Sequence, residues 1–253
     1  MTTFKITLEY DGRNFVGWQR QASDSGRTVQ GVLEEALGRL CAHPVVLHGS
    51  GRTDAGVHAK GQTASFITSS GRQPQQVVQG GNCLLPPDVA ILAAKVMPDD
   101  FHARYSAIGK IYEYDFDLSP TRRPLRDGRA WWVGPDMNWS EIEAALPFLV
   151  GEHDFAAFRS VGSPTKSTVR TIHRAELSAP EPDIRRLTFE GTGFLRHMVR
   201  AMAGVLAEIG RGRLKAASLA DIIESKDRAQ SGPTAPPDGL YLRRVIYPGN
   251  FPD

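Results

Sequence analysis

The alternation of apolar and polar residues predicts strands in both halves of the chain. The clearest cases are Phe4–Asp11 and Lys110–Asp117, and the second places Tyr112, Tyr114 and Phe116 on one face. A period of two residues is typical of a strand that buries one face. Further strands are expected at Pro44–His48, Gln62–Thr68, Thr168–Leu177, Ile184–Glu190 and Leu240–Tyr247, and a buried strand at Val89–Met97.

Apolar residues three and four positions apart predict helices between these strands. Thr28 is suited to cap a helix that runs to about Leu40, and Phe194–Ile209 is the strongest helical segment, ended by Gly210. Weaker helical patterns are expected at Gln75–Leu84, after Ser218 with Asp221, and after Ser140, which has Glu143 at the spacing of a capping box.

This order of elements favours an α+β fold with a largely antiparallel sheet over a doubly wound parallel sheet. The segments Thr168–Leu177 and Ile184–Glu190 form a predicted hairpin, joined through Ala179–Pro182. Each half of the chain has strands that flank a helix, without a low-complexity segment or a clear linker between the halves.

Composition narrows the class of protein. The 253 residues are 41% hydrophobic and 23% charged, and no run approaches the roughly 18 apolar residues of a membrane span. The N-terminus alternates at once and lacks the pattern of a signal peptide. Only Cys41 and Cys83 occur, without metal-ligand spacing. We therefore expect a cytoplasmic protein with free thiols, no membrane segment and no metal.

The net charge of +2 does not by itself predict nucleic-acid binding, but 23 of the 30 basic residues are arginine. Arginine matches phosphate geometry and stacks on bases, although the codon usage of a GC-rich genome would give the same composition. Arginines cluster in Thr121–Arg129 and again at Arg196, Arg200, Arg211 and Arg213, followed by Lys215. Either cluster is a solvated face or a surface that follows RNA phosphates.

The segment Gly49–His58 carries the strongest chemical signal. It presents the carboxylate of Asp54 in a loop with three glycines, two residues after Arg52. A carboxylate in such a loop can act as nucleophile or base when a cation keeps it ionised. The alternative is a tight turn in which Asp54 bonds only to the backbone nearby.

Several familiar chemistries are excluded by their missing motifs. The sequence has no P-loop, no complete Rossmann glycine pattern, no zinc-deaminase signature, no H-E-x-x-H and no G-x-S-x-G. We therefore expect chemistry without a metal or a nucleotide cofactor.

A set of specific strings runs along nearly the whole length of the chain. The most specific is Gly51–Ala59, which reads GRTDAGVHA and is followed by Gln62. The others, in chain order, are Glu9–Gly12, Phe15, Gly17–Gln19, Thr28–Gln30, Leu85–Pro86, Phe101–Ala107, Tyr112–Tyr114, His153–Phe155, Val169–Arg170, Gly193–Leu195, His197–Arg200 and Gly239–Leu242. In these strings the chain resembles the TruA family of tRNA pseudouridine synthases.

The resemblance implies a fold of two related halves, here residues 1–104 with the aspartate loop and 105–253, whose sheets join around a central cleft. It implies a cofactor-free isomerisation of uridine to pseudouridine at positions 38, 39 and 40 of the tRNA anticodon arm. The N1–C1′ bond breaks, a C5–C1′ bond forms, and the proton on C5 leaves. It also implies a homodimer.

The resemblance assigns roles to five residues. Asp54 matches the catalytic aspartate. Tyr112 matches a tyrosine that stacks on the uracil or assists proton removal. Arg200 matches the basic residue that pairs with the aspartate. Arg52 is expected to contact the RNA or help extrude the base, and Leu240 to line the pocket, with Tyr241 or Leu242 as alternatives for that role. Other motif residues, such as Trp18 and Phe101, are expected in the core.

Two other classes of function remain at this stage. An RNA-binding protein without catalysis could use the same basic surfaces, although it has no need of Asp54, Tyr112 and Arg200 together. A phosphosugar enzyme could use the glycine-rich loop to hold an anion.

Overall fold

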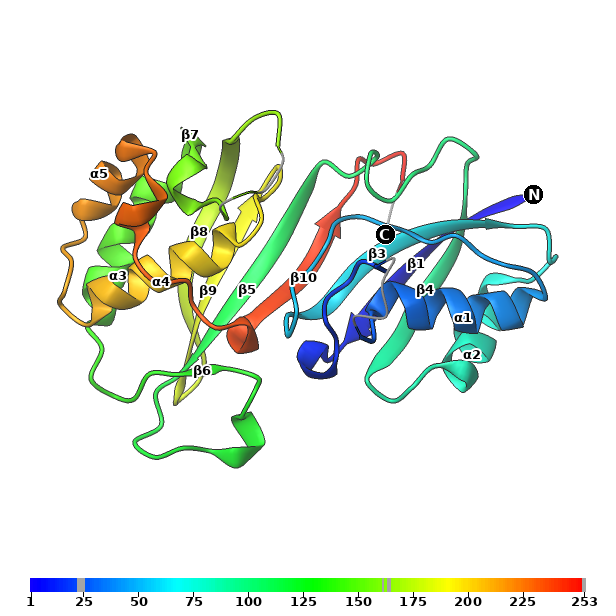
Figure 1. Ribbon diagram of the computed structural model, residues 1–253, viewed down its shortest axis with the longest axis horizontal. Coiled ribbons are helices and arrows are strands. Elements are labelled where there is room, and N and C mark those ends of the chain that lie inside the picture. Colours follow the sequence, from blue (N-terminus) through cyan, green and yellow to red (C-terminus); the bar gives the residue numbers. More distant parts are fainter. Residues whose placement is uncertain (22–25, 161, 163–164, 252–253) are drawn as a thin grey trace. The chain divides into compact units, whose positions relative to one another are not determined.

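A computed structural model describes residues 1–21, 26–160, 162 and 165–251 (Figure 1). The chain divides into two compact units. The first contains Met1–Ile108 together with Tyr241–Asp253, and the second contains Gly109–Leu240. The last strand, β10 (Leu240–Ile246), therefore starts where the second unit ends and continues within the first.

The first unit is built on a mixed sheet in the order β4, β1, β3, β10. Strand β1 (Thr2–Tyr10) runs antiparallel to both β3 (His58–Thr68) and β4 (Val89–Met97). Strand β10 pairs parallel with β3, and the two-residue strand β2 (His48–Gly49) pairs antiparallel with β3. The long predicted strands of this half are thereby confirmed.

Two helices, α1 (Val29–Cys41) and α2 (Pro74–Leu84), lie side by side over one face of this sheet (Figure 1). Leu33 and Leu37 of α1 are fully buried, as the predicted stripe requires. Thr28 caps α1 as expected, because its side-chain oxygen accepts a hydrogen bond from the backbone N–H of Gly31 at 3.2 Å.

The opposite face of this sheet is polar but also covered. Ser65 of β3 accepts a hydrogen bond from the backbone N–H of Ala103 at 3.0 Å, and Tyr247 donates from its hydroxyl to the carbonyl of Ala103 at 2.6 Å. Phe101 packs beside Tyr247 in a small core with Met97 and Phe251. The segment around Ala103 is therefore fixed to the sheet at several points.

The second unit contains an antiparallel sheet in the order β5, β9, β8, β7. Its strands are β5 (Gly109–Asp117), β9 (Ile184–Gly191), β8 (Val169–Glu181) and β7 (Gly151–Asp154), and the short β6 (Trp131–Trp132) pairs parallel with β5. The predicted hairpin is confirmed, with a shorter connection than expected.

The described residues of the second unit form the α-helices α3 (Trp139–Ala145), α4 (Met198–Gly210) and α5 (Ser218–Ser225). Tyr112, Tyr114 and Phe116 of β5 are all buried, as the alternation predicted. Short 3-10 helices in the described part of the chain are Gly12–Asn14, Pro124–Arg126, Leu146–Leu149, Phe155–Phe158, Arg228–Ser231 and Pro237–Gly239. Mostly antiparallel strands with flanking helices confirm the α+β prediction.

Among the described residues, no helix combines the length and the apolar character needed to cross a membrane.

The predicted strand at Pro44–His48 is wrong over most of its length, since only His48 joins Gly49 in β2. The backbone N–H of Leu47 donates to the carboxylate of Glu34, and the carbonyl of Leu47 accepts from the amide of Gln30. Two side chains of α1 thus satisfy the polar backbone that a neighbouring strand would otherwise pair.

The segment Val89–Met97 is a strand, but the expectation that it is buried is wrong for much of its length. It forms the edge strand β4, and Leu92 and Val96 are 49% and 54% exposed. An apolar run does not distinguish a central strand from an edge strand, because both have apolar residues on the covered face.

Two predicted helix starts are also wrong. The cap of α3 is Asn138, whose side-chain oxygen accepts from the N–H of Glu141, while Ser140 lies inside the helix. Helix α4 begins at Met198 instead of Phe194, because His197 has a left-handed backbone with φ of 63°. A left-handed residue cannot continue a right-handed helix, so residues 194–197 are a separate turn.

Candidate active site

Asp54 lies in the irregular loop between β2 and β3 of the first unit. Asp54 is half-buried, and its neighbour two residues earlier, Arg52, is exposed. The backbone carbonyl of Asp54 accepts a hydrogen bond from the N–H of Val57 at 3.2 Å. The local reading of the sequence as a turn is therefore correct for the backbone of Asp54.

The segment after β1 holds one side of this loop. The hydroxyl of Tyr10 is 2.8 Å from the side-chain oxygen of Thr53, the residue before Asp54. The N–H of Trp18 donates to the carbonyl of Thr53 at 3.1 Å, and the N–H of Gly56 donates to the carbonyl of Phe15 at 3.3 Å. Residues on both sides of Asp54 are thus tied to the Tyr10–Trp18 segment.

Two glycines allow this close approach. A Cβ atom on Gly12 would lie 2.1 Å from the carbonyl oxygen of Val57, a distance that no side chain tolerates. Gly17 has φ of +117°, and a Cβ atom there would lie 3.0 Å from the carbonyl oxygen of Thr53. Glycine is therefore needed at both positions for the Tyr10–Trp18 segment to reach the aspartate loop.

Gln62 and Ser50 hold the other side of the loop. The amide nitrogen of Gln62 donates to the carbonyl of Gly51 at 3.1 Å, and its amide oxygen accepts from the Ser50 hydroxyl at 2.7 Å. The N–H of Ser50 also donates to the carbonyl of Thr63 at 2.8 Å. Because Gln62 is fully buried, these bonds are shielded from water and fix the loop before Arg52.

A buried histidine closes the C-terminal end of the loop. Nδ1 of His58 accepts the N–H of Gly12 at 3.1 Å, and it lies 3.4 Å from a carboxylate oxygen of Asp11. Burial opposes the charge of Asp11, but hydrogen bonds from Arg13 outweigh it and hold the pKa of that carboxyl below its ordinary value. The ring of His58 stacks on Tyr241 of β10.

Tyr112 lies on β5 in the second unit. It is buried, and its ring meets the ring of Phe194 edge to face, with 4.9 Å between centroids. Phe194 belongs to the turn before α4. The ring of Tyr112 is thus fixed by an aromatic neighbour on its own unit, an arrangement that suits a residue whose ring stacks on a base.

Arg200 lies on α4, half-buried, beside the segment that leads to Leu240. Its Nε atom donates to the carbonyl of Ala235 at 2.8 Å, and the N–H of Ala235 donates back to the carbonyl of Arg200 at 3.0 Å. Tyr114 donates from its hydroxyl to the carbonyl of Pro236 at 2.8 Å. Burial raises the pKa of the Tyr114 phenol, although the charge of Arg200 acts in the opposite direction.

Leu240 follows the turn Pro237–Gly239 and is buried. The structure therefore brings Arg200, Tyr114 and the segment from Ala235 to Leu240 together within the second unit. Arg52 and Asp54 belong to the first unit. The pairing of Arg200 with Asp54 joins residues of different units and stays a prediction.

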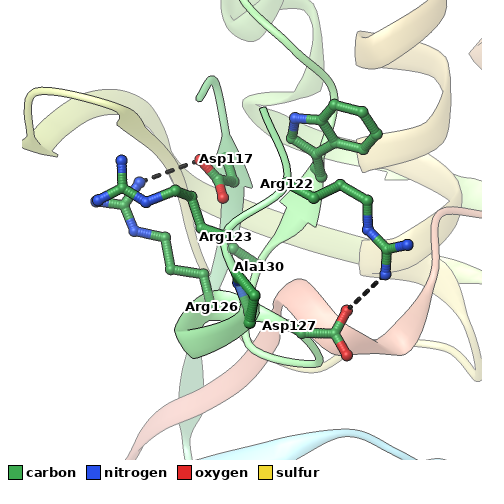
Figure 2. Close-up of a pocket in the computed structure, with 8 residues that line it drawn as sticks. Asp117, Arg122, Arg123, Arg126, Asp127 and Ala130 are labelled. Atoms are coloured by element: carbon green, nitrogen blue, oxygen red, sulfur yellow. Dashed lines mark hydrogen bonds and ion pairs between the residues drawn. The ribbon is translucent and has the colours of Figure 1, made fainter. Parts of the chain in front are cut away.

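The basic loop Thr121–Arg129 lines a pocket of about 390 Å³ in the second unit (Figure 2). Arg126 forms ion pairs with Asp117 at 3.1 Å and Glu181 at 2.9 Å, so most of its charge is compensated. Arg122 lies 3.6 Å from Asp127, with both side chains exposed. Of the arginines that Figure 2 labels, Arg123 forms no ion pair with the described residues.

Two arginines of the second basic cluster share one carboxylate. Arg211 and Arg213 both bond to the carboxylate of Glu208, at 2.8 and 2.9 Å. Burial disfavours the charge of Glu208, but the hydrogen bonds of the two arginines lower its pKa below the ordinary value. Arg196, which precedes α4, is exposed.

The sequence did not assign a role to Tyr10, Thr53 or Gln62, although all three hold the aspartate loop. Tyr10 and Gln62 lie within or beside the segments that match the family, and this position was the one signal in the sequence that could have identified them. Trp18 and Phe101 are buried, as predicted.

Comparison with known proteins gives one family. The family model described as tRNA pseudouridine synthase matches residues 6–106 and 145–248. These two ranges include Asp54 and Arg200, and they omit the basic loop.

Curated relatives agree over nearly the full length. The chain is 43% identical to tRNA pseudouridine synthase A of Syntrophotalea carbinolica over 247 residues, covering 98% of this chain and 97% of the relative. It is 43% identical to the protein of the same name from a Geobacter species, covering 98% and 100%. It is 42% identical to that of Neisseria gonorrhoeae, covering 97% and 92%.

Proposed function

The chain belongs to the tRNA pseudouridine synthase family, an isomerase family, and on this basis we propose that it converts uridine to pseudouridine at positions 38, 39 and 40 of the tRNA anticodon arm. The observation that supports this most directly is the anchoring of the Asp54 loop. Thr53, Gly51 and Gly56 are all tied to neighbouring segments, so the backbone around the carboxylate is fixed before any RNA binds.

The proposed chemistry needs a carboxylate at the reacting nucleotide. Asp54 attacks the sugar at C1′, attacks the base at C6, or removes the C2′ proton, and all three routes end with a C5–C1′ bond and loss of the C5 proton. Arg200 keeps the carboxylate ionised by placing a cation beside it. No cofactor is required for these steps, since no electrons enter or leave the nucleotide.

The remaining residues act on the base and on the RNA. Tyr112 stacks on the uracil or assists removal of the C5 proton, and Leu240 contributes apolar surface to the pocket. A uridine within a stem must leave the stack before C1′ and C5 can be reached. Arg52, which is exposed beside Asp54, fills the vacated space or holds a phosphate.

The reaction is tested by tritium release from unmodified tRNA labelled at C5 of uridine. The wild type should release tritium, and Asp54→Ala should not, while both bind tRNA with similar affinity. Asp54→Asn keeps the shape of the side chain and should also be inactive. Release by Asp54→Asn at the wild-type rate would exclude Asp54 as the catalytic carboxylate.

The same assay separates the alternative classes of function. An RNA-binding protein without catalysis would bind tRNA and release no tritium with any variant. A phosphosugar enzyme would be stabilised against heat by small sugar phosphates in the absence of RNA.

We also propose that the protein is a homodimer in the cytoplasm. The two cysteines support a reducing compartment, since Cys41 is buried and Cys83 is exposed and both are free thiols. Light scattering at micromolar concentration tests the dimer, and a monomer would contradict it.

A further inference from the structure

Three side-chain rings of the first unit form a tilted stack, with angles of 35° and 37° between the planes of successive rings. The ring centroids of His48 and His102 are 4.9 Å apart, and those of His102 and Tyr105 are 4.4 Å apart. Tyr105 is at the outer end and is 77% exposed, and His48 is also exposed. None of the roles proposed above uses these residues.

The turn that carries this stack is fixed to the body of the unit. Phe101 and Ala103 are buried, and the N–H of Ser106 donates to the carbonyl of His102 at 2.9 Å. The Ser106 hydroxyl in turn accepts the N–H of His102 at 3.1 Å. The backbone at Tyr105 is therefore held by its own turn, so a ligand would not have to order this segment of the chain.

His102 is bonded to the backbone of its own turn. Its Nδ1 atom accepts the N–H of Arg104 at 3.0 Å and the N–H of Tyr105 at 3.4 Å. Burial and then the neighbouring His48 lower its pKa below the ordinary value, which favours the uncharged ring.

A cation lies over the exposed ring. The guanidinium carbon of Arg104 is 5.8 Å from the ring centroid of Tyr105. The stretch Phe101–Ile108 has no acidic residue, and Asp99 and Asp100 precede the buried Phe101. An aromatic ring and a guanidinium in contact fit a nucleotide, because both can stack on a base and the guanidinium can also bind a phosphate.

The stack belongs to the same unit as the aspartate loop. His48 is the first residue of β2, and the loop with Asp54 begins directly after this strand. We propose that a stacking platform holds an unpaired nucleotide of the tRNA substrate and that it is formed by His48, His102, Arg104 and Tyr105. This proposal rests on the proposed function. The base stacks on Tyr105, and Arg104 contacts the adjacent phosphate.

The platform is tested with Tyr105→Ala, Tyr105→Phe and Ile108→Ala. Ile108 is the matched control, because it is an exposed apolar residue close by that takes no part in the stack. Tyr105→Ala should bind unmodified tRNA on the order of 10- to 100-fold more weakly, the usual effect of removing a base–aromatic stack. Tyr105→Phe keeps the ring and should bind like the wild type, as should Ile108→Ala.

A second RNA identifies what the ring contacts. An anticodon stem-loop has unpaired bases, whereas a fully paired duplex of the same length has none to stack. The loss with Tyr105→Ala should appear for the stem-loop and be absent for the duplex. Equal losses for the two RNAs, or a loss no larger than with Ile108→Ala, would overturn the platform.

Light scattering of the same variants tests whether this surface instead contacts a second copy of the chain. Dissociation of a dimer by Tyr105→Ala, with tRNA affinity unchanged, would assign the surface to that contact and overturn the platform. The binding assay does not depend on turnover. If the wild type releases tritium normally and Tyr105→Ala binds tRNA as tightly as the wild type, the platform alone is refuted. If the wild type releases no tritium, the proposed function is refuted.

Discussion

The hydroxyl of Tyr10 lies 2.8 Å from the side-chain oxygen of Thr53, the residue directly before Asp54. Both residues are buried, and 43 positions separate them in the sequence. Burial raises the pKa of the Tyr10 phenol, so the hydroxyl stays protonated at neutral pH. The end of β1 therefore sets the backbone position of Asp54 through one buried hydrogen bond.

Removing this hydroxyl should impair catalysis more than binding. Tyr10→Phe leaves the hydroxyl of Thr53 buried without this partner, which should lower the free energy of unfolding by about 1–2 kcal/mol. We expect kcat for tritium release to fall several-fold with little change in KM, because a displaced carboxylate acts mainly on the chemical step. Thr53→Ser retains the oxygen and is the control. An unchanged kcat in Tyr10→Phe would show that this bond does not position Asp54.

The close approach of Gly12 to the aspartate loop gives a second prediction. Gly12→Ala would place a methyl group 2.1 Å from the carbonyl oxygen of Val57, so the loop backbone must move. We expect a loss of unfolding free energy of roughly 3 kcal/mol and a fall in kcat of at least tenfold, measured by denaturant unfolding and tritium release.

Gly249→Ala is the matched control for Gly12→Ala. No atom lies within 4 Å of a Cβ built at Gly249, and its φ is not in the left-handed region. Its stability and kcat should equal those of the wild type. If both variants behave alike, close packing at Gly12 is not what holds the loop.

Much of the fold could be predicted from the sequence because its signals are local. The alternation of Tyr112, Tyr114 and Phe116 gave a buried strand face, and Thr28 gave a helix cap. The strand expected from Pro44 failed because its backbone bonds to side chains of α1, a tertiary contact that leaves no period in the sequence. The late start of α4 depends on one backbone angle at His197.

The family was correctly predicted from the motif strings, and the comparisons confirm it. The strings name the residues without saying what each one contacts. Tyr10 and Gln62 reach the aspartate loop through side-chain hydrogen bonds across the fold, and no periodicity reveals such a bond. The roles of Asp54, Tyr112, Arg200, Arg52 and Leu240 in the reaction stay predictions until the variants are measured.

A third prediction concerns pH. Asp88 and Arg27 form a two-bond ion pair with distances of 2.6 and 2.7 Å. The hydrogen bond from Arg27 lowers the pKa of Asp88, so folding favours the ionised form. The stabilisation is present in full above the ordinary value near 3.8 and is lost as the pH falls through the lower pKa of the folded state.

Asp88→Asn removes the charge and measures this stabilisation. At pH 7 the variant should be less stable than the wild type by about 1 kcal/mol, a value reduced for the partial exposure of both side chains. The difference in stability between the variant and the wild type should shrink as the pH falls below about 4, because Asp88 of the wild type then becomes protonated, first in the unfolded and then in the folded state. Thermal unfolding at several pH values measures both quantities. A difference that does not vary with pH would mean that packing, and not charge, accounts for the loss.

Two arginines of the loop Thr121–Arg129 should have different roles: Arg126 stabilises the fold and Arg123 binds RNA (Figure 2). Arg126 bonds to the buried carboxylate of Asp117, which also accepts from Ser119. Arg126→Ala should lower the free energy of unfolding by about 2 kcal/mol, because it leaves a buried carboxylate without its cation. Arg123 is exposed and forms no ion pair with the described residues, so Arg123→Ala should leave stability unchanged.

If this loop follows the RNA backbone, the effect of Arg123→Ala appears in the salt dependence of tRNA binding. Each phosphate contact contributes about 0.7–0.9 to the slope of log affinity against log salt concentration. Arg123→Ala should reduce that slope by about one, with kcat unchanged, because the residue holds phosphate and does not touch the reacting base. Arg213→Ala is the control, since it removes an equal charge from a side chain that is already paired with Glu208. Equal slopes for Arg123→Ala and Arg213→Ala would make the loop a solvated surface, and the arginine content of the chain would then say nothing about RNA at this site.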